Sequence, residues 1–196
     1  MKAPDQFSIY ILAGGKSSRM GKDKGLCLLN GKPMIEYVIG QVTPISDSVF
    51  IITANEDYRI FNKELILDVF KDKGPAGGID TALQHAKTDF IFVVACDMPF
   101  IDFNSIIKLF NHLKNHDIAI IKNGSQIESL FGFYNKSIAP KWRDLLKNHN
   151  LKVSDYYQYF DTNFVDSVSF LSQNEKLFYN TNTPEELNKA LQWKRK

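Results

Sequence analysis

The sequence has few of the features that mark several common classes of protein. Its 196 residues include only two cysteines, Cys27 and Cys96, which are too few and too isolated for a disulfide framework or a paired-cysteine zinc site. No apolar run is long enough to span a membrane, and the opening residues MKAPDQ do not resemble a signal peptide. These absences predict a cytoplasmic globular protein that does not associate with membranes.

The chain also lacks an excess of charge of either sign. It has 24 basic and 22 acidic residues, which give a formal net charge of +2 at pH 7. Proteins that bind nucleic acid through bulk charge are usually strongly basic. We therefore expect no nucleic-acid partner, and any anion site must come from local clustering of cations.

Few residues form a recognisable catalytic or metal-binding pattern. His112 and His116 are four residues apart, but on a polar helix face they are more typical of a solvated surface than of a metal site. No Ser-His-Asp arrangement stands out. Cys96 ends an apolar run, so a buried structural cysteine is a better interpretation than a nucleophile.

Apolar runs and helical spacings alternate along most of the chain. The segments that we expect to be strands are 7–13, 48–53, 65–70, 90–95, 118–121, 130–134 and 164–170. Those that we expect to be helices are 34–42, a stretch from the 74–78 turn to residue 86, 104–116, 137–147 and a final helix from residue 184. Thr183 and Glu186 form a capping box for that last helix. The alternation predicts a single three-layer α/β domain, Rossmann-like, with a mainly parallel central sheet.

A glycine-rich segment, residues 12–24, follows the first expected strand and reads LAGGKSSRMGKDK. Its Gly-Lys-Ser looks like the end of a P-loop, but Tyr10 occupies the position where that motif needs its first glycine. The dinucleotide pattern G-x-G-x-x-G fails as well, because Gly14 and Gly15 are adjacent. Neither standard nucleotide motif is therefore present.

The same segment still has the properties of an anion site. Glycines allow backbone N–H groups to approach an anion closely. Four cations follow them: Lys16, Arg19, Lys22 and Lys24. A solvated turn with ordinary surface lysines is the alternative. The position directly after a buried strand favours a phosphate site, suited to a triphosphate.

Two further polar residues follow expected strands, Asn55 after the second and Asp97 after the fourth. Ligands of open α/β sheets bind outside the carboxyl ends of the strands, so both residues are expected in one shared pocket with the glycine-rich loop. Asp97 is suited to bind Mg²⁺ together with phosphate oxygens, although a turn aspartate before Pro99 is the alternative. The glycines of the turn 74–78 either form a tight connection or let a base or ribose lie against the backbone.

Four groups of motifs occur in a fixed order. Residues 12–38 contain L-A-G-G, R-M-G, D-K and N-G-K-P. G-P-x-x-G follows at 74–78, C-D-x-P at 96–99 and N-x-N-T-P-E-E-L at 180–187. This combination, which covers nearly the whole chain, resembles the molybdenum cofactor guanylyltransferase family of the NTP-transferase-like superfamily. One departure is Ser129, where the family often has proline.

The resemblance implies a Mg²⁺-dependent nucleotidyltransferase that joins GMP from GTP to molybdenum-bound molybdopterin. The products would be pyrophosphate and the molybdopterin guanine dinucleotide cofactor. It implies one domain over residues 1–196, with a nucleotide-binding part at about 7–122 and an acceptor or pterin-binding part at about 123–196. We expect a monomer that contacts cofactor-biosynthesis proteins and recipient molybdoenzymes.

The resemblance and the residue patterns together predict the site residues. The nucleotide-binding residues are Leu12, Ala13, Gly14, Gly15, Lys24, Asn55, Asp68, Gly74, Gly78 and Asp97. Asp97 is also the expected Mg²⁺ ligand, and Arg19 and Lys24 would stabilise the triphosphate as pyrophosphate leaves. Asn180 and Asn182 would line the pterin side.

Three other functions fit part of the sequence. A molybdopterin cytidylyltransferase would resemble L-A-A-G at the first motif and D-Q-P at the later one, so Gly14 and Met98 favour guanine. A sugar- or alditol-phosphate nucleotidyltransferase would share the first loop but not the ending at 180–187. A GTP-binding protein without catalysis would not need Asp97.

Overall fold

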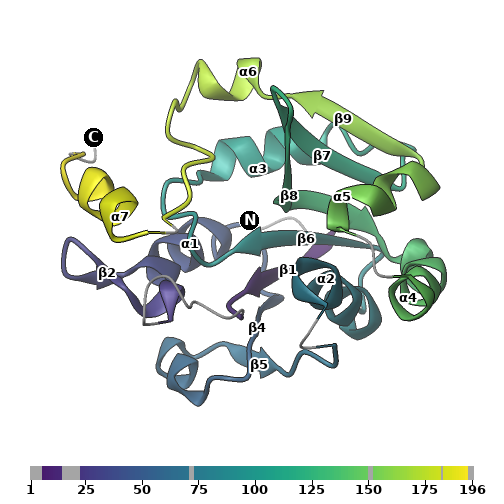
Figure 1. The fold of residues 1–196 in the computed structure, drawn as a ribbon, viewed down its shortest axis with the longest axis horizontal. Helices are drawn as coiled ribbons and strands as arrows, with labels where there is room; N and C mark the ends of the chain where they lie inside the picture. Colours follow the sequence, from purple (N-terminus) through teal and green to yellow (C-terminus); the bar gives the residue numbers. More distant parts are fainter. Residues whose placement is uncertain (1–5, 15–22, 71–72, 150–151, 182, 194–196) are drawn as a thin grey trace.

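The computed structural model describes residues 6–14, 23–70, 73–149, 152–181 and 183–193. A seven-stranded sheet runs through the centre and helices cover both of its faces (Figure 1). This arrangement confirms the predicted three-layer α/β fold.

The strand order of the sheet is β5-β4-β1-β6-β8-β7-β9. In chain order the strands are β1 (Phe7–Leu12), β4 (Val49–Ile52), β5 (Glu64–Ile66), β6 (Phe90–Ala95), β7 (Ile118–Asn123), β8 (Gln126–Asn135) and β9 (Thr162–Asp166). Among these seven described strands, β8 alone runs antiparallel to its neighbours, so the sheet is mainly parallel as predicted. The carboxyl ends of β1, β4 and β6 therefore meet at one edge, together with the start of β8.

Two hydrophobic clusters lie on opposite faces of the sheet. Helices α1 (Met34–Val42), α3 (Phe103–Phe110) and α6 (Val168–Leu171) pack against one face. Helices α2 (Gly74–His85), α4 (Ala139–Asn148) and α5 (Val153–Tyr156) pack against the other (Figure 1). The strands are apolar on both faces because both are covered, which explains the nearly continuous apolar runs in the sequence.

A buried ion pair joins α2 to α4. Asp80 is fully buried, and its Oδ2 atom lies 2.7 Å from Arg143 Nη2. Arg143 Nε also donates to both carboxylate oxygens of Asp80 at 3.2 Å. A buried carboxylate is costly without a partner, so this contact fixes the two helices relative to each other.

The C-terminal helix α7 (Pro184–Leu191) packs on a small hairpin formed by β2 (Leu28–Leu29) and β3 (Lys32–Pro33) (Figure 1). Asn30 and Gly31 both have positive φ at the hairpin turn, as a tight two-residue connection requires. Thr183 Oγ1 accepts from Glu186 N at 3.1 Å, and Glu186 Oε2 accepts from Thr183 N at 2.9 Å. This confirms the predicted capping box.

The structure differs from the sequence predictions in four main places. The expected strand 65–70 is much shorter, because β5 ends at Ile66. The stretch 164–170 is not one strand, because β9 ends at Asp166 and α6 follows. The Asp166 carboxylate accepts from Val168 N at 2.8 Å, a local turn that ends the strand. Helix α3 ends at Phe110 rather than at residue 116, and β8 begins four residues before the expected start.

In the described part of the chain, no helix is long and apolar enough to cross a membrane.

Short 3-10 helices complete the loops beside the sheet. They are η1 (Lys24–Leu26), η2 (Glu56–Phe61), η3 (Lys136–Ile138) and η4 (Tyr157–Tyr159). Two of these matter for the site: η1 carries Lys24, and η2 follows β4 and carries Tyr58.

Candidate active site

A cavity of about 820 Å³ lies at the edge where β1, β4 and β6 end and β8 begins. Most of the described residues predicted for the site line it: Leu12, Ala13, Gly14, Lys24, Asp68, Gly74, Gly78, Asp97 and Asn180. The predicted residues Gly15, Arg19 and Asn182 lie outside the described residues. Segments far apart in the sequence therefore meet at one cavity, as the strand-end argument predicts.

Lys24 and Asp97 form an ion pair in the cavity wall. Lys24 begins η1 and Asp97 follows β6, and Lys24 Nζ lies 3.3 Å from Asp97 Oδ2. Asp97 is only 8% exposed. Burial raises the pKa of the Asp97 carboxyl above its usual value, and the Lys24 ammonium opposes that rise. A further cation that enters the cavity would stabilise the ionised form of this carboxylate.

Asp23 holds the segment that carries Lys24. Its carboxylate accepts hydrogen bonds from the Tyr58 hydroxyl, from Asn55 Nδ2 at 3.2 Å and from Gly25 N at 3.2 Å. The next residue, Lys24, is thereby positioned opposite Asp97. Sequence reasoning missed both Asp23 and Tyr58. The adjacent Asp-Lys pair was a signal for Asp23, whereas nothing local marks Tyr58.

Gly25 allows this segment to lie close to the sheet. A Cβ atom at Gly25 would overlap the Tyr58 hydroxyl and lie 3.1 Å from Cys96 Cβ. Cys96 is buried behind it, and burial raises the pKa of its thiol well above the usual range. Cys96 is thus a structural residue rather than a nucleophile, as predicted.

The structure places Asn55 beside the cavity wall rather than in it. Asn55 caps η2, where its Oδ1 accepts from Asp57 N at 3.0 Å, and its Nδ2 donates to Asp23. The neighbouring Thr53 and Ala54 line the cavity instead. Asp68 does line it, and its Oδ1 accepts from Thr81 Oγ1 at 3.1 Å and from Phe70 N at 2.8 Å.

The glycines of the 74–78 turn have structural reasons of their own. Gly74 has φ +56°, a conformation that favours glycine. A Cβ at Gly77 would lie 2.5 Å from the Phe70 carbonyl oxygen, and one at Gly78 would lie 2.5 Å from Leu12 Cδ2. Close packing therefore accounts for Gly77 and Gly78. Gly74 and Pro75 line the cavity at the start of α2, so the positive end of that helix dipole lies at the cavity.

The opposite wall is formed by the first part of β8, by Val153 and by Asn180. Asn180 Oδ1 is a buried oxygen without a hydrogen-bond partner in the described part of the chain. The next residue, Thr181, is tied to the loop after β6, since its backbone N donates to the Asp97 carbonyl oxygen at 3.3 Å. Glu128 also lines this wall and is 5% exposed. Its burial raises the pKa of the Glu128 carboxyl to about 7, and no local sequence pattern marks this residue.

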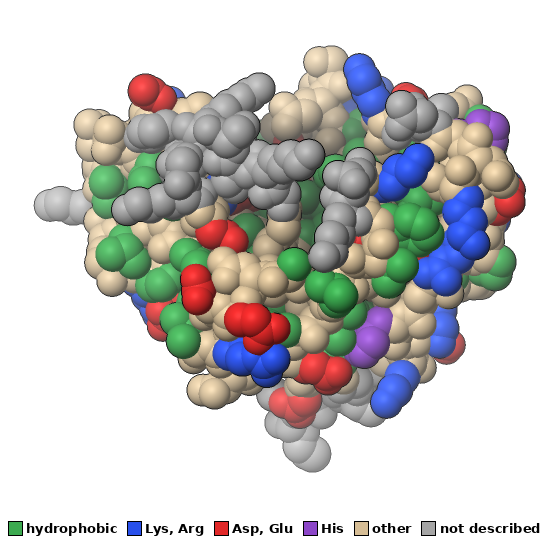
Figure 2. Space-filling model, turned by 60° about the horizontal axis from the view of Figure 1, so that its bottom comes forward, with side chains coloured by type: hydrophobic (Ala, Val, Ile, Leu, Met, Phe, Trp, Pro, Cys, Tyr) green, Lys and Arg blue, Asp and Glu red, His purple; other side chains and the backbone are tan. Residues whose placement is uncertain are grey.

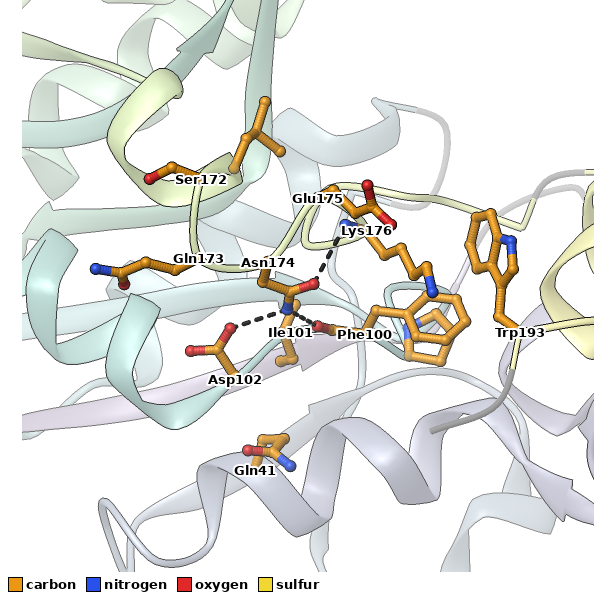
Figure 3. Close-up of a pocket in the computed structure, with 12 residues that line it drawn as sticks. Gln41, Phe100, Ile101, Asp102, Ser172, Gln173, Asn174, Glu175, Lys176 and Trp193 are labelled. Atoms are coloured by element: carbon orange, nitrogen blue, oxygen red, sulfur yellow. Dashed lines mark hydrogen bonds between the residues drawn. The ribbon is translucent and has the colours of Figure 1, made fainter. Parts of the chain in front are cut away.

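A second cavity, of about 640 Å³, lies between α1, the segment 99–102 and the segment 171–176 (Figure 3). Asn174 makes several of the hydrogen bonds that line this cavity. The Asn174 Nδ2 atom donates to the Phe100 carbonyl oxygen at 2.8 Å and to Asp102 Oδ2 at 3.0 Å. Its Oδ1 accepts from Lys176 N at 3.2 Å. These polar groups bind one another, and none of the predicted site residues that the structure describes lies there. We therefore take the first cavity as the candidate active site.

Figure 2 brings the β5 end of the molecule forward. Acidic, basic and hydrophobic side chains are interspersed on this face, with Lys and Arg mostly on the side of α4. No continuous basic surface is visible on the part of this face that the structure describes.

Comparisons with known proteins show the family to which this chain belongs. The family profile described as "MobA-like NTP transferase domain" matches residues 9–158. A protein from Vibrio campbellii named "Molybdenum cofactor guanylyltransferase" is 41% identical over 192 residues, which cover 95% of this chain and 96% of that protein. The chain belongs to the molybdenum cofactor guanylyltransferase family. A Flavobacterium johnsoniae relative, "Probable molybdenum cofactor guanylyltransferase", is 38% identical over 152 residues, 77% of this chain and 80% of its own.

A solved structure supports the fold of this guanylyltransferase-family protein. The molybdopterin-guanine dinucleotide biosynthesis protein A from Archaeoglobus fulgidus superposes with a TM-score of 0.81 at 24% identity, covering 94% of this chain and 96% of that one. At this identity the likeness concerns the fold alone. Family membership makes the protein a nucleotidyltransferase, which confirms the predicted enzyme class.

Proposed function

We propose that this enzyme transfers GMP from GTP to the phosphate of molybdenum-bound molybdopterin. The products are the molybdopterin guanine dinucleotide cofactor and pyrophosphate. One observation carries the proposal: the Lys24–Asp97 pair lies in a strand-end cavity of a chain that is 41% identical to a named molybdenum cofactor guanylyltransferase. The cavity has a wall for each substrate.

The nucleotide wall consists of Leu12, Ala13, Gly14, Asp68 and the start of α2. We assign the nucleotide-binding part of the single domain to about 7–122, because these residues all lie within it. The acceptor wall includes residues 126–130 and Asn180, so we assign the acceptor part to about 123–196. Gly15 and Arg19 belong to the proposed phosphate site, and Asn182 to the proposed pterin site, by the family motifs alone.

The reaction is a displacement at the α-phosphorus of GTP. An oxygen of the acceptor phosphate, already ionised at neutral pH, forms a bond to that phosphorus, so no general base is needed. The bond to the oxygen that bridges the α- and β-phosphates breaks, and the electron pair leaves with pyrophosphate. Lys24 neutralises charge on the triphosphate, and the walls of the cavity hold the two reacting groups in line.

The residues present fit a Mg²⁺ ion bound with the nucleotide. In the described part of the chain, no group of three or more His, Cys, Asp or Glu could hold a metal by itself. Mg²⁺ commonly binds one or two carboxylates together with substrate phosphates and water, so the buried Asp97 suffices. Asp97 would hold Mg²⁺ against the phosphates, where the ion would neutralise developing negative charge.

The Asp97→Asn variant tests the role of this carboxylate. We expect pyrophosphate release to fall by about two orders of magnitude or more, because residue 97 loses the negative charge that would bind the cation. Asp89→Asn is the matched control, since Asp89 is exposed and precedes β6 at the opposite edge of the sheet. Unchanged turnover in Asp97→Asn, with both variants folded, would remove Asp97 from the reaction.

The proposal extends to the setting of the enzyme. We propose that it acts in the cytoplasm as a monomer, receives molybdenum-loaded molybdopterin from cofactor-biosynthesis proteins and supplies recipient molybdoenzymes. The two isolated cysteines support the cytoplasmic location, and the resemblance supports the other points. Size-exclusion chromatography with light scattering tests the monomer, and a dimer mass would contradict it.

A further inference from the structure

A bulge in β8 shapes the acceptor wall. In the pairing of β7 with β8, Ile120 lies opposite Gly132, but the next residue, Ile121, lies opposite Glu128. Three residues of β8, at positions 129–131, therefore have no counterpart on β7. Bulges beside active sites commonly redirect side chains. Here the bulge adjoins the residues 126–130 that line the cavity.

Glu128 is a buried acceptor that the reaction described above does not use. Its side chain is 5% exposed, and no hydrogen bond or ion pair engages its carboxyl group within the described residues. Burial alone raises its pKa to about 7. A carboxyl group in such a place is costly to the fold unless a ligand supplies donors.

Asn180 provides an independent observation on the same wall. Its Oδ1 is also buried and without a donor among the described residues. Two acceptors without donors, on one wall of one cavity, fit a ligand that carries several N–H groups. A phosphate group, which only accepts hydrogen bonds when ionised, does not fit them.

The position of Glu128 in the sheet indicates that it lies nearer the acceptor than the nucleotide. The sheet order is β4-β1-β6-β8, so the start of β8 is separated from β1 and β4 by β6. Gly14 lies just beyond β1, and the start of α2 packs on the last residue of that strand, since a Cβ at Gly78 would lie 2.5 Å from Leu12 Cδ2. Glu128 therefore faces the half of the cavity left for the second substrate.

We propose that Glu128 determines acceptor specificity by binding the 2-amino-4-oxopyrimidine edge of the pterin. This edge presents a ring N–H and an amino N–H side by side, which match the two oxygens of a carboxylate. The inference rests on the proposed function, since it takes the acceptor to be a pterin. Guanine carries the same edge, so the experiment must separate the two substrates.

Steady-state kinetics of the Glu128→Gln variant distinguishes an effect on the pterin acceptor from an effect on GTP. The amide replaces one acceptor by a donor, which opposes the pterin amino group. We expect the KM for the molybdopterin acceptor to rise about 10- to 100-fold and the KM for GTP to change less than about twofold. Glu175→Gln is the control, because Glu175 is exposed and lies at the second cavity. A rise in the KM for GTP alone, or no change in either, would overturn the proposal.

A measurement on the unaltered protein does not depend on how the variant folds. A simple pterin should bind, by titration calorimetry, at least about tenfold more tightly than lumazine, in which a carbonyl replaces the amino group. Equal affinity for the two would overturn the role of Glu128. This titration contains no nucleotide, so its outcome is independent of whether GTP or CTP is the donor.

Discussion

The buried Glu128 predicts that the stability of this protein falls as pH rises through neutrality. Its pKa is raised from 4.5 to about 7 by burial, so the folded protein binds this proton more tightly than the unfolded chain does. The stabilisation is complete below pH 4.5 and is lost as pH rises through about 7. At about 1.4 kcal/mol for each pH unit, the full loss is about 3.5 kcal/mol, an upper limit because the adjoining cavity admits water.

Comparing the wild-type protein with Glu128→Gln isolates this contribution. The other ionisable groups of the same cavity, Asp23, Lys24, Asp68 and Asp97, are present in both proteins, so their titration largely cancels in the difference. Urea unfolding at pH 5 and pH 8.5 gives the free energy of unfolding at each pH. We expect the variant to gain up to about 3 kcal/mol relative to the wild type between these pH values, or roughly 6–12 °C in Tm.

The result that refutes this reasoning is a constant difference between the two proteins. If Glu128→Gln and the wild type lose stability in parallel from pH 5 to pH 8.5, the Glu128 carboxyl does not titrate in a buried site. Glu175→Gln is the control and should keep the pH dependence of the wild-type stability, because the Glu175 side chain is exposed to solvent.

Two structural predictions follow from the contacts around the site. Tyr58→Phe removes a hydroxyl donor to Asp23, so we expect the free energy of unfolding in urea to fall by about 1–2 kcal/mol and the KM for GTP to rise. If the free energy of unfolding and the KM both keep their wild-type values, Asp23 is held without the Tyr58 hydroxyl. Arg143→Leu leaves the fully buried Asp80 without its ionic partner, so we expect a loss of about 3–5 kcal/mol at pH 7. A loss below about 1 kcal/mol would mean that this ion pair does not fix α2 to α4.

Much of the fold could be predicted because its elements have strong local patterns. The helix at 34–42 and the strand at 90–95 have the predicted bounds, since buried apolar residues define both. The error at 164–170 has a local cause, the Asp166 side chain that turns the chain after five strand residues. The bulge in β8 depends on its register with β7 and on no local pattern, so the sequence could not predict it.

The site was predictable where a residue's position in a strand or a motif was enough. Asp97 was predicted from its position after a strand and Lys24 from the basic loop, and the two form an ion pair in the structure. Tyr58 and Glu128 were missed because their roles depend on tertiary contacts, one with Asp23 and the other with the interior of the cavity. Asn55 was expected in the pocket because it follows a strand, but its side-chain amide binds Asp23 and Asp57 beside the cavity instead.

Donor selectivity with the natural acceptor tests the central claim most directly. The purified protein is incubated with molybdenum-loaded molybdopterin, Mg²⁺ and either GTP or CTP, and pyrophosphate release is measured with the mass of the pterin product. We predict pyrophosphate and a product heavier by one GMP unit with GTP, and neither with CTP. Turnover with CTP alone, or with neither nucleotide, would contradict the proposed guanylyl transfer.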